Sequence, residues 1–336
     1  MRTSDFHYHL PESAIAQEAI EPRDSARLLD TRDLSDRRFS DLPAMLRSGD
    51  LLVVNRTRVR PARLTGAKDG SGGKVEALLL RPLGDGSWEA LVRPARRIRA
   101  GTRLRFGGLL AVVAEGPSQG KVVLRSEGGS FEDAAETIGE VPLPPYFHGR
   151  LEDSERYQTV YGDRSRSAAA PTAGLHFTRP LLGELAASGI DVAAVELDIG
   201  LDTFQPIATP DLESHQIHTE RFEVGAEVGA AVERTRRRGG RVVAVGTTVV
   251  RALESAADAA GGVTQQTADT ALFIAPGYRF RVVDLLVTNF HVPGSTLVVL
   301  VAAFMGPAWR AAYSTALARG YRFLSFGDAM LAERAS

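Results

Sequence analysis

The sequence predicts an α/β protein in which a mostly parallel sheet with flanking helices carries an inserted small β-barrel domain. Strands alternate with helices from about residue 155 to the end, a pattern typical of parallel strands joined by helical crossovers. Residues 61–140 contain six short β-rich runs separated by turn clusters, which indicates a small closed barrel or sandwich. The length of 336 residues suits about two domains. We therefore expect an α/β domain of residues 1–60 and 141–336, interrupted by a barrel domain of residues 61–140.

The first 60 residues are expected to contribute two helices and one strand. Residues 23–29 lead into a charged stretch, and residues 41–46 place Asp at a cap position and Pro in the first helical turn. The apolar run Leu51–Asn55 follows a Gly-Asp pair and predicts a buried strand.

The six runs of the barrel are recognised by short apolar alternation between glycine-rich turns. They span residues 63–66, 75–80, 88–92, 104–106, 109–114 and 121–125. Residues 83–88 read as a hairpin turn. The three prolines within residues 141–146 exclude a helix or a central strand, so this segment is expected to be an extended connector back to the α/β domain.

The remaining elements follow from hydrophobic periodicity. Helices are predicted over residues 180–188, 226–238, 248–260, 296–305 and 309–319. Strands are predicted over residues 192–197, 241–246, 282–288 and 321–326.

Composition limits the function classes. The 40 basic side chains nearly balance the 41 acidic ones, which excludes a globally basic nucleic-acid clamp but not a local basic face. Cysteine is absent, which excludes disulfides, thiolate metal sites and cysteine nucleophiles. The apolar run 297–305 is far shorter than the roughly 20 residues needed to cross a bilayer, and the first residues lack the apolar core of a secretory signal. We expect a cytoplasmic protein with no membrane partner.

Several common binding-site motifs are incomplete or absent in this sequence. The glycine-rich stretch 70–74 lacks the leading glycine of a phosphate loop and the hydroxyl residue after its lysine. No G-x-G-x-x-G follows a predicted strand, which argues against a dinucleotide site. His215, His218 and Glu220 lie close in sequence, but no further ligand cluster accompanies them, so no metal site is predicted.

Two segments after predicted strands are better candidates. Thr247 and Thr248 open a helix that carries Arg251, and a helix N-terminus attracts a carboxylate or phosphate; a plain threonine cap is the alternative. Asn289 and His291 follow another strand, where open α/β sheets bind ligands; a hydrogen-bonded loop histidine is the alternative.

Two further loops carry polar groups of interest. Residues 171–177 form a small-residue loop that ends in His176 and an aromatic residue, which is typical of close approach to a ligand, or of a bare turn. Asp198 and Asp202 follow a predicted strand and are candidate bases, or capping acids of a solvated loop.

Taken in order, these segments resemble the S-adenosylmethionine:tRNA ribosyltransferase-isomerase family of queuosine biosynthesis. Any one piece is weak, but the ordered set covers almost the whole chain. It comprises residues 5–17, 23–29, 57–64, 88–91, 142–146, 155–161, 170–177, 203–206, 245–255, 276–284, 288–297 and 327–330.

The resemblance implies a specific reaction. The family moves the ribosyl part of S-adenosylmethionine onto the aminomethyl group of 7-aminomethyl-7-deazaguanine in tRNA and isomerises the sugar, giving epoxyqueuosine and releasing adenine and methionine. S-adenosylmethionine would then be a consumed substrate, with no true cofactor and no metal. The second partner would be a tRNA anticodon stem-loop, and a monomer is expected.

The resemblance also implies site residues, which combine with the motifs above. The proton-transfer candidates are His176, His291, Glu254 and Asp198. The S-adenosylmethionine candidates are Thr172, Gly174, Phe177, Thr247, Thr248, Arg251, Asn289, Ser295, Thr296 and Asp328. Thr247, Thr248 and Arg251 are the expected partners of the methionine carboxylate. The candidates for RNA or a second substrate are Asn55, Arg58, Tyr157, Gln158, Arg96 and Arg97.

The chain departs from the family pattern in four motif cores. The family often has Asp at the position of Arg56, usually has His at the position of Asp198, and usually has a small hydroxyl residue at the position of Val249. It has small residues where Leu201 and Asp202 stand. These changes leave open a paralogue that uses S-adenosylmethionine on a small amine or nucleoside. They also leave open a catalytically inactive binding protein that retains the nucleotide pocket.

Overall fold

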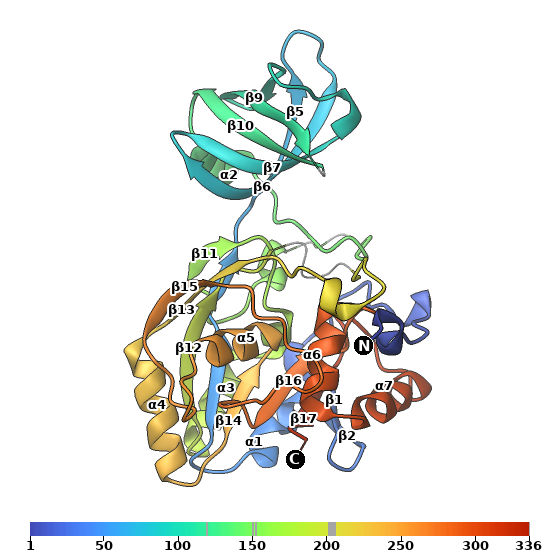
Figure 1. Ribbon diagram of the computed structural model, residues 1–336, viewed down its shortest axis with the longest axis vertical. Coiled ribbons are helices and arrows are strands. Elements are labelled where there is room, and N and C mark those ends of the chain that lie inside the picture. Colours follow the sequence, from blue (N-terminus) through green and yellow to red (C-terminus); the bar gives the residue numbers. More distant parts are fainter. Residues whose placement is uncertain (119, 150, 152, 201–205, 336) are drawn as a thin grey trace. The chain divides into compact units, whose positions relative to one another are not determined.

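The chain divides into two compact units. The computed structural model describes residues 1–118, 120–149, 151, 153–200 and 206–335 (Figure 1). The larger unit consists of Met1–Arg58 and Pro144–Ser336, and the smaller one consists of Val59–Leu143. The smaller unit is thus a continuous insertion in a discontinuous one.

A nine-stranded sheet forms the centre of the larger unit, in the order β15-β13-β12-β3-β14-β16-β17-β1-β2. Its strands are β1 (Arg27–Asp30), β2 (Ser35–Arg38), β3 (Leu51–Asn55), β12 (Asp191–Leu197), β13 (Glu220–Val224), β14 (Val242–Val245), β15 (Gln266–Thr270), β16 (Leu285–Asn289) and β17 (Ala329–Glu333). The central strands β12, β3, β14 and β16 are parallel. A further short pair joins β4 (Thr57–Val59) to β11 (Arg164–Ser167).

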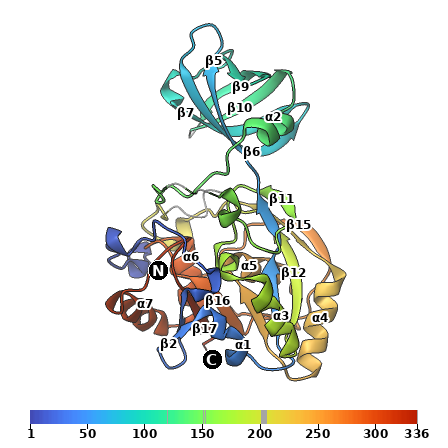
Figure 2. The same cartoon turned by 180° about the vertical axis from the view of Figure 1, so that it is seen from behind.

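Helices cover both faces of this sheet. They are α1 (Leu42–Met45), α3 (Arg179–Ala187), α4 (Ala226–Arg237), α5 (Thr247–Ser255), α6 (Thr296–Met305) and α7 (Ala308–Ala318). Short 3₁₀ turns lie at Thr3–Phe6, Glu12–Ala14, Arg23–Ser25, Phe39–Asp41, Ser154–Tyr157, Thr172–His176 and Leu212–Ser214. Helices α4, α5 and α6 cover the face that is nearer in Figure 1, and α1 and α3 cover the face that is nearer in Figure 2.

Strand β3 shows why the sheet is buried on both sides. Successive side chains of a strand point to opposite faces, so Leu51 and Val53 enter the core under α4 and α5. Leu52 and Val54 enter the core under α1 and α3. An unbroken apolar strand is the expected signature of a strand that is covered twice.

Helix α6 is the most apolar helix of the larger unit. The Ser295 hydroxyl caps it by accepting a hydrogen bond from the Val298 amide, and nine of its ten residues are buried. Among the described helices, none is by itself long and apolar enough to cross a membrane. Only α6 and α7 taken together pass that test, and the two are bent by 116° at the break between them.

The smaller unit is a closed six-stranded antiparallel barrel in the order β10-β7-β6-β5-β8-β9. Its elements are β5 (Arg63–Lys68), β6 (Lys74–Gly84), β7 (Ser87–Arg93), the 3₁₀ turn Ala95–Arg97, β8 (Arg103–Phe106), β9 (Leu109–Ser118), β10 (Lys121–Gly128) and α2 (Phe131–Ile138). Alternate side chains fill the interior, among them Trp88, Phe106 and Phe131. The predicted α/β class with an inserted β-barrel is confirmed.

Several details of the prediction are wrong. The sheet is mixed rather than mostly parallel, because four of its eight neighbouring strand pairs are antiparallel. Residues 1–60 hold one α-helix rather than two, since residues 27–30 form strand β1. The predicted strand at 321–326 is irregular, with Leu324 at φ 69, and the last strand is β17 instead. Helix α5 ends at Ser255 rather than at residue 260.

Candidate functional site

The carboxyl ends of the four parallel strands bring the predicted polar segments to one edge of the sheet. Asn55 ends β3, and Leu197 ends β12. Gly246 directly follows β14, and Asn289 ends β16. This edge is where open α/β sheets bind ligands, so the segments predicted from sequence do converge.

Three small hollows open beside this edge, and all three are lined by Leu297 from α6. Each encloses between about 260 and 370 Å³, counting space open to solvent. We call them together the Leu297 cleft. The first hollow is lined by Arg251 and Thr296, the second by Asn289 and His291, and the third by residues of both neighbours. The three hollows therefore adjoin one another around the Leu297 side chain at this edge of the sheet.

The N-terminus of α5 forms one wall of the cleft. Gly246 holds φ at +89, a backbone conformation that suits glycine, and it turns the chain from β14 directly into the helix. Thr247 and Thr248 are 6% and 8% exposed and line the first and third hollows. The Thr248 hydroxyl is buried with no hydrogen-bond partner in the described chain. The first-turn amides of a helix lack intrahelical acceptors, so this wall offers donors and a partial positive charge to an anion.

Arg251 lines the first hollow, but its guanidinium group contacts other groups of the protein. It forms a buried ion pair with Glu220, whose side chain is 2% exposed. It also donates to the backbone carbonyls of Leu272 at 3.2 Å and Thr270 at 3.4 Å. These contacts join α5 to β13 and β15. Arg251 therefore fixes the floor of the hollow, and the amides and hydroxyls of α5 remain as the donors for an anion.

His291 faces the cleft from the segment after β16. It lines the second and third hollows, and its Nε2 lies 2.9 Å from the Thr288 hydroxyl. Burial lowers the pKa of His291 to about 3, so the imidazole is neutral near pH 7. The neutral ring is the form that can accept a proton, and burial makes it a weaker base than a free imidazole.

His176 is buried behind the cleft instead. Its ring stacks on Phe39 with centroids 4.8 Å apart, and its Nε2 accepts a hydrogen bond of 3.2 Å from the Asn289 amide. Burial, together with nearby Arg156, lowers the pKa of His176 to about 3. Asn289 in turn accepts a hydrogen bond of 3.1 Å from Thr172. His176 thus supports two cleft-lining side chains rather than meeting a ligand itself.

A comparison with protein-family models identifies the family of this chain. A family model described as "Queuosine biosynthesis protein" matches residues 3–332. The chain belongs to this queuosine biosynthesis family.

Relatives match this chain over nearly its whole length. A protein of Symbiobacterium thermophilum named S-adenosylmethionine:tRNA ribosyltransferase-isomerase is 50% identical, and the match covers 98% of this chain and 99% of that protein. A protein of the same name from Pelotomaculum thermopropionicum is 49% identical, with the same coverage. The crystal structure of an S-adenosylmethionine tRNA ribosyltransferase from Thermotoga maritima is 37% identical with a TM-score of 0.55, covering 98% of this chain and 99% of that one.

Two acidic site candidates, Glu254 and Asp328, make other contacts. The Glu254 carboxylate accepts backbone amide hydrogen bonds from Arg281, Val282 and Val283 at 2.9–3.1 Å. Asp328 accepts from the amides of Arg27 at 2.9 Å and Arg322 at 2.8 Å. Neither lines a hollow of the cleft. In this structure their carboxylates hold loops together.

Three of the predicted S-adenosylmethionine contacts also have local roles. Phe177 is fully buried among Phe39 and Tyr161. Gly174 packs against Tyr161, since a Cβ there would lie 2.1 Å from the tyrosine hydroxyl. Ser295 lines the second hollow, but its hydroxyl caps α6 and donates to Val292 at 2.7 Å.

The RNA candidates divide into buried and exposed sets. The Asn55 side chain is 1% exposed and bonds the backbone of Thr57 and Leu197. Tyr157 and Gln158 are 0% and 4% exposed, so none of these three presents a side chain to a macromolecule. Arg58 is partly exposed and pairs with Glu155, and Arg96 and Arg97 are exposed on the barrel.

The residues that depart from the family pattern lie in different parts of the larger unit. Arg56 pairs with Glu196 at 2.7 Å. Asp198 is half-buried just after β12, and Val249 is fully buried under the sheet. Leu201 and Asp202, and the matched residues 203–205, lie outside the described residues.

Several cleft residues were not predicted. Thr288 lies one position before the end of β16, and Tyr146 and Ser325 line the second hollow with a hydroxyl–hydroxyl contact of 2.6 Å. A residue at a strand end gives some sequence signal, as Thr288 does. Tyr146 stands in a proline-rich connector, and only the fold brings it to the cleft.

The contact between Gly174 and Tyr161 gives a stability prediction. Gly174→Ala should lower the free energy of unfolding by about 1–3 kcal/mol, because the new methyl group enters a packed core. The Tyr161 hydroxyl has no partner in the described chain, so adding Tyr161→Phe should restore part of the loss. Urea unfolding of both variants measures this, and an additive double variant would contradict the contact.

The two buried histidines predict acid sensitivity. Their folded pKa of about 3 lies below the unfolded value of about 6.5. The unfolded chain therefore binds more protons between these values, and the free energy of unfolding falls as pH falls from about 6.5 towards 3. Each histidine should cost about 2 kcal/mol at pH 5 relative to pH 7.5. Urea titrations of His176→Gln at both pH values should show a smaller difference than the parent chain; an equal difference would rule this out.

Proposed function

We propose that this chain is an S-adenosylmethionine:tRNA ribosyltransferase-isomerase that forms epoxyqueuosine in tRNA. The observation that carries the proposal is the near-complete match to proteins of that name at 47–50% identity. The Leu297 cleft supports it, because it combines a helix N-terminus with a neutral imidazole at the ligand-binding edge of the sheet. A tRNA substrate makes the cytoplasm the expected site of action.

The chemistry assigns roles to the cleft. The positive sulfonium acidifies the neighbouring 5′ carbon of the ribosyl group, so a base must take that proton. His291 is the proposed base, and Asp198 is the alternative at the same edge. The acceptor amine loses a proton and forms a new bond to the sugar, and the sugar rearranges into an epoxide-bearing ring through new ring bonds. The bonds to adenine and to sulfur break, so adenine leaves with a proton and methionine leaves as a neutral thioether.

The α5 wall suits the amino-acid end of S-adenosylmethionine. Its free amides and the Thr248 hydroxyl are donors, and the methionine carboxylate is an acceptor. Thr172, Asn289 and Thr296 complete the polar lining of the cleft. No further cofactor is needed for this reaction.

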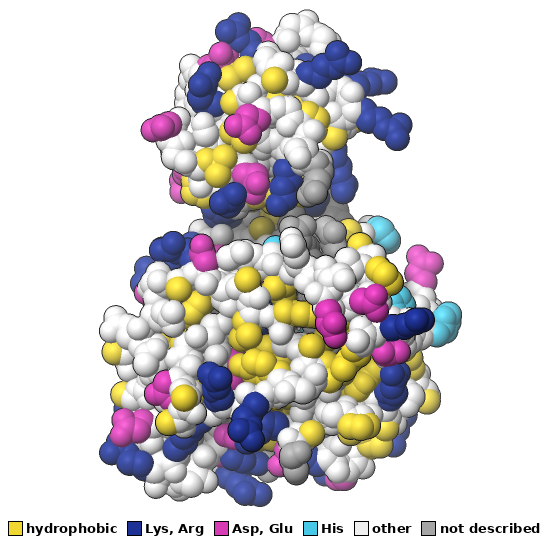
Figure 3. Space-filling view, viewed as in Figure 1, with side chains coloured by type: hydrophobic (Ala, Val, Ile, Leu, Met, Phe, Trp, Pro, Cys, Tyr) yellow, Lys and Arg dark blue, Asp and Glu magenta, His cyan; other side chains and the backbone are white. Residues whose placement is uncertain are grey.

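The barrel supplies the proposed long-range attraction for tRNA. Val59–Leu143 contains 13 basic and ten acidic side chains, whereas the rest of the chain contains 27 and 31. Figure 3 shows Lys and Arg gathered on this unit. Arg93, Arg96, Arg97 and Arg99 are exposed, and none has an ion pair within the described residues. Such a surface attracts phosphates without reading sequence.

The decisive experiment incubates the protein with S-adenosylmethionine and tRNA that carries the 7-aminomethyl-7-deazaguanine precursor. Mass spectrometry of the digested tRNA should show the epoxyqueuosine nucleoside, with one adenine released per product. tRNA without the precursor is the control and should give neither. Adenine release with a small amine but no product on tRNA would replace the proposal by the small-acceptor activity.

A further inference from the structure

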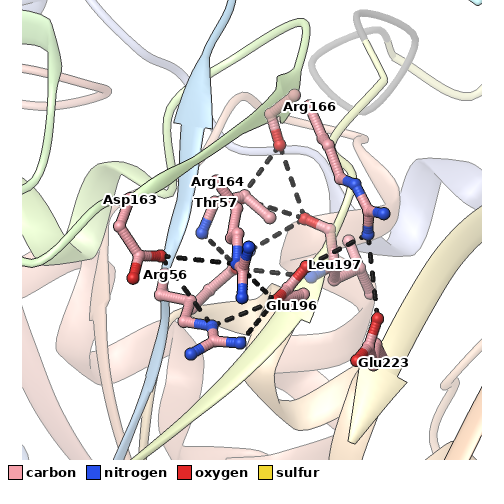
Figure 4. Close-up of polar contacts among 10 residues, drawn as sticks. Arg56, Thr57, Asp163, Arg164, Arg166, Glu196, Leu197 and Glu223 are labelled. Carbon is pink, nitrogen blue, oxygen red and sulfur yellow. Dashed lines mark hydrogen bonds and ion pairs between the residues drawn. The ribbon is translucent and has the colours of Figure 1, made fainter.

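A buried carboxylate gathers three arginines at the carboxyl end of β12 (Figure 4). The Glu196 side chain is only 5% exposed. It accepts hydrogen bonds from Arg56 at 2.7 Å and Arg166 at 3.1 Å, and it pairs with Arg164 at 3.4 Å. We call these four residues the Glu196 cluster. The sequence motifs discussed above do not account for it.

The cluster carries more positive than negative charge at short range. Within it, three guanidinium groups share one carboxylate. Two other acids stand at its rim, Asp163 at 3.9–4.0 Å and Glu223 at 3.7 Å, beyond hydrogen-bond distance. Both are well exposed, at 61% and 44%, and such exposed pairs contribute little. Asp163 and Glu223 therefore do not prevent a more highly charged anion, such as a phosphate, from binding to the arginines.

Arg164 and Arg166 are the accessible members. Their side chains are 55% and 49% exposed, whereas that of Arg56 is 31% exposed. They stand two residues apart on β11, so both point to the same side of the strand. Glu196 holds both guanidinium groups in place, which lowers the entropy cost of binding a ligand there.

The strands beneath the cluster are fixed by buried hydrogen bonds. The Leu197 carbonyl accepts from Asn55 at 3.0 Å and from the Thr57 hydroxyl at 3.2 Å. The Ser167 hydroxyl lies 2.9 Å from that of Thr57. This network joins β3, β4, β11 and β12, so the cluster has a rigid base.

The same two segments continue into the Leu297 cleft. The Ala168 amide donates to the Ile199 carbonyl at 3.0 Å, and the Ile199 amide donates to Ser167 at 3.1 Å. Ile199 and Ala170 line the third hollow. The chain therefore passes from the exposed arginines to the cleft within four residues of Arg166.

We propose that Arg164 and Arg166 bind phosphate groups of the RNA strand whose modified base occupies the Leu297 cleft, with Glu196 as their positioning residue. The inference rests on the proposed function and adds the surface that holds the acceptor strand. Guanidinium groups match phosphate oxygens in a bidentate geometry. A small amine acceptor has no phosphates to fill this surface.

The test compares two double variants of the full chain that remove equal charge. R164Q/R166Q removes the proposed contacts. R237Q/R238Q is the matched control, because these arginines are 67% and 63% exposed and Arg238 pairs with Asp191 at the amino end of β12. Binding of precursor-carrying tRNA is measured between 50 and 200 mM salt, and thermal unfolding of both variants verifies their fold.

The expected results are specific to the first variant. R164Q/R166Q should weaken tRNA binding on the order of tenfold at low salt. The slope of log affinity against log salt should become shallower by about 1.4, as for two lost contacts to a single strand. KM for S-adenosylmethionine should stay unchanged. R237Q/R238Q should keep the parent slope, and R164K/R166K should restore the slope but not the full affinity, because lysine keeps the charge and loses the fork.

Two failures are distinguishable. If the parent chain forms epoxyqueuosine and R164Q/R166Q has the slope of the control, the phosphate contacts are disproved and the proposed function stands. If the parent chain neither binds nor modifies precursor tRNA, both proposals fail together.

Discussion

Replacing His291 by glutamine is expected to lower kcat for epoxyqueuosine formation by roughly 10²–10⁴-fold, the usual loss for a missing general base. The imidazole faces two hollows of the Leu297 cleft and is neutral near pH 7. Glutamine can keep a polar contact to Thr288 but has no basic ring nitrogen to accept a proton from the substrate. Adenine release and epoxyqueuosine formation under single turnover measure the chemical step directly.

His176→Gln is the matched control for this prediction. His176 is also a buried neutral imidazole, but it contacts Asn289 and Phe39 behind the cleft. It should lose stability and less than about tenfold in kcat, since it acts only through Asn289. A larger kcat loss for His176→Gln than for His291→Gln would reverse the two roles.

Replacing Arg251 by methionine is expected to destabilise the larger unit by about 3–5 kcal/mol, because it leaves the buried Glu220 carboxylate without its cation. A direct contact to the methionine carboxylate would instead raise KM for S-adenosylmethionine in a stably folded protein. Urea unfolding and KM together separate these outcomes.

The double variant R251M/E220M sharpens this result. Removing both charges from a buried pair is often nearly neutral, so the double variant should recover most of the lost free energy. Thr248→Val is the parallel probe of the α5 wall and should raise KM for S-adenosylmethionine with little loss of stability. If R251M is stable and raises KM alone, Arg251 is a ligand contact after all.

The barrel and the helices were predictable because local signals agree with the final contacts. The alternating run in β7 matches its burial pattern, and the apolar run of α6 is buried on nearly all sides. Edge strands were missed because their sequences carry little apolar pattern. Strand β15 reads Gln-Thr-Ala-Asp-Thr, and only its pairing with β13 makes it a strand.

The site was predictable to the level of the segment but not of the side chain. Strand ends placed Thr248, Asn289 and His291 correctly at one edge of the sheet. Residue type alone did not distinguish His291 from His176, because the partners that bury His176 come from distant segments. The surroundings of Glu254 could not be read from the sequence for the same reason, since its carboxylate accepts hydrogen bonds from amides about 28 residues away in the chain.

The discontinuity of the larger unit has a consequence for how the chain is made. The barrel is complete when residue 143 has been synthesised, whereas the partners of β3 among the described strands are β12 and β14. At 5–20 residues per second, roughly 7–30 s pass between the synthesis of β3 and that of β12. During that time the apolar run of β3, residues 51–54, has no partner strand although the barrel is already complete. The larger unit therefore cannot complete its sheet until its second segment, which begins at Pro144, has been translated. Nascent chains halted before residue 190 should need chaperones to avoid aggregation.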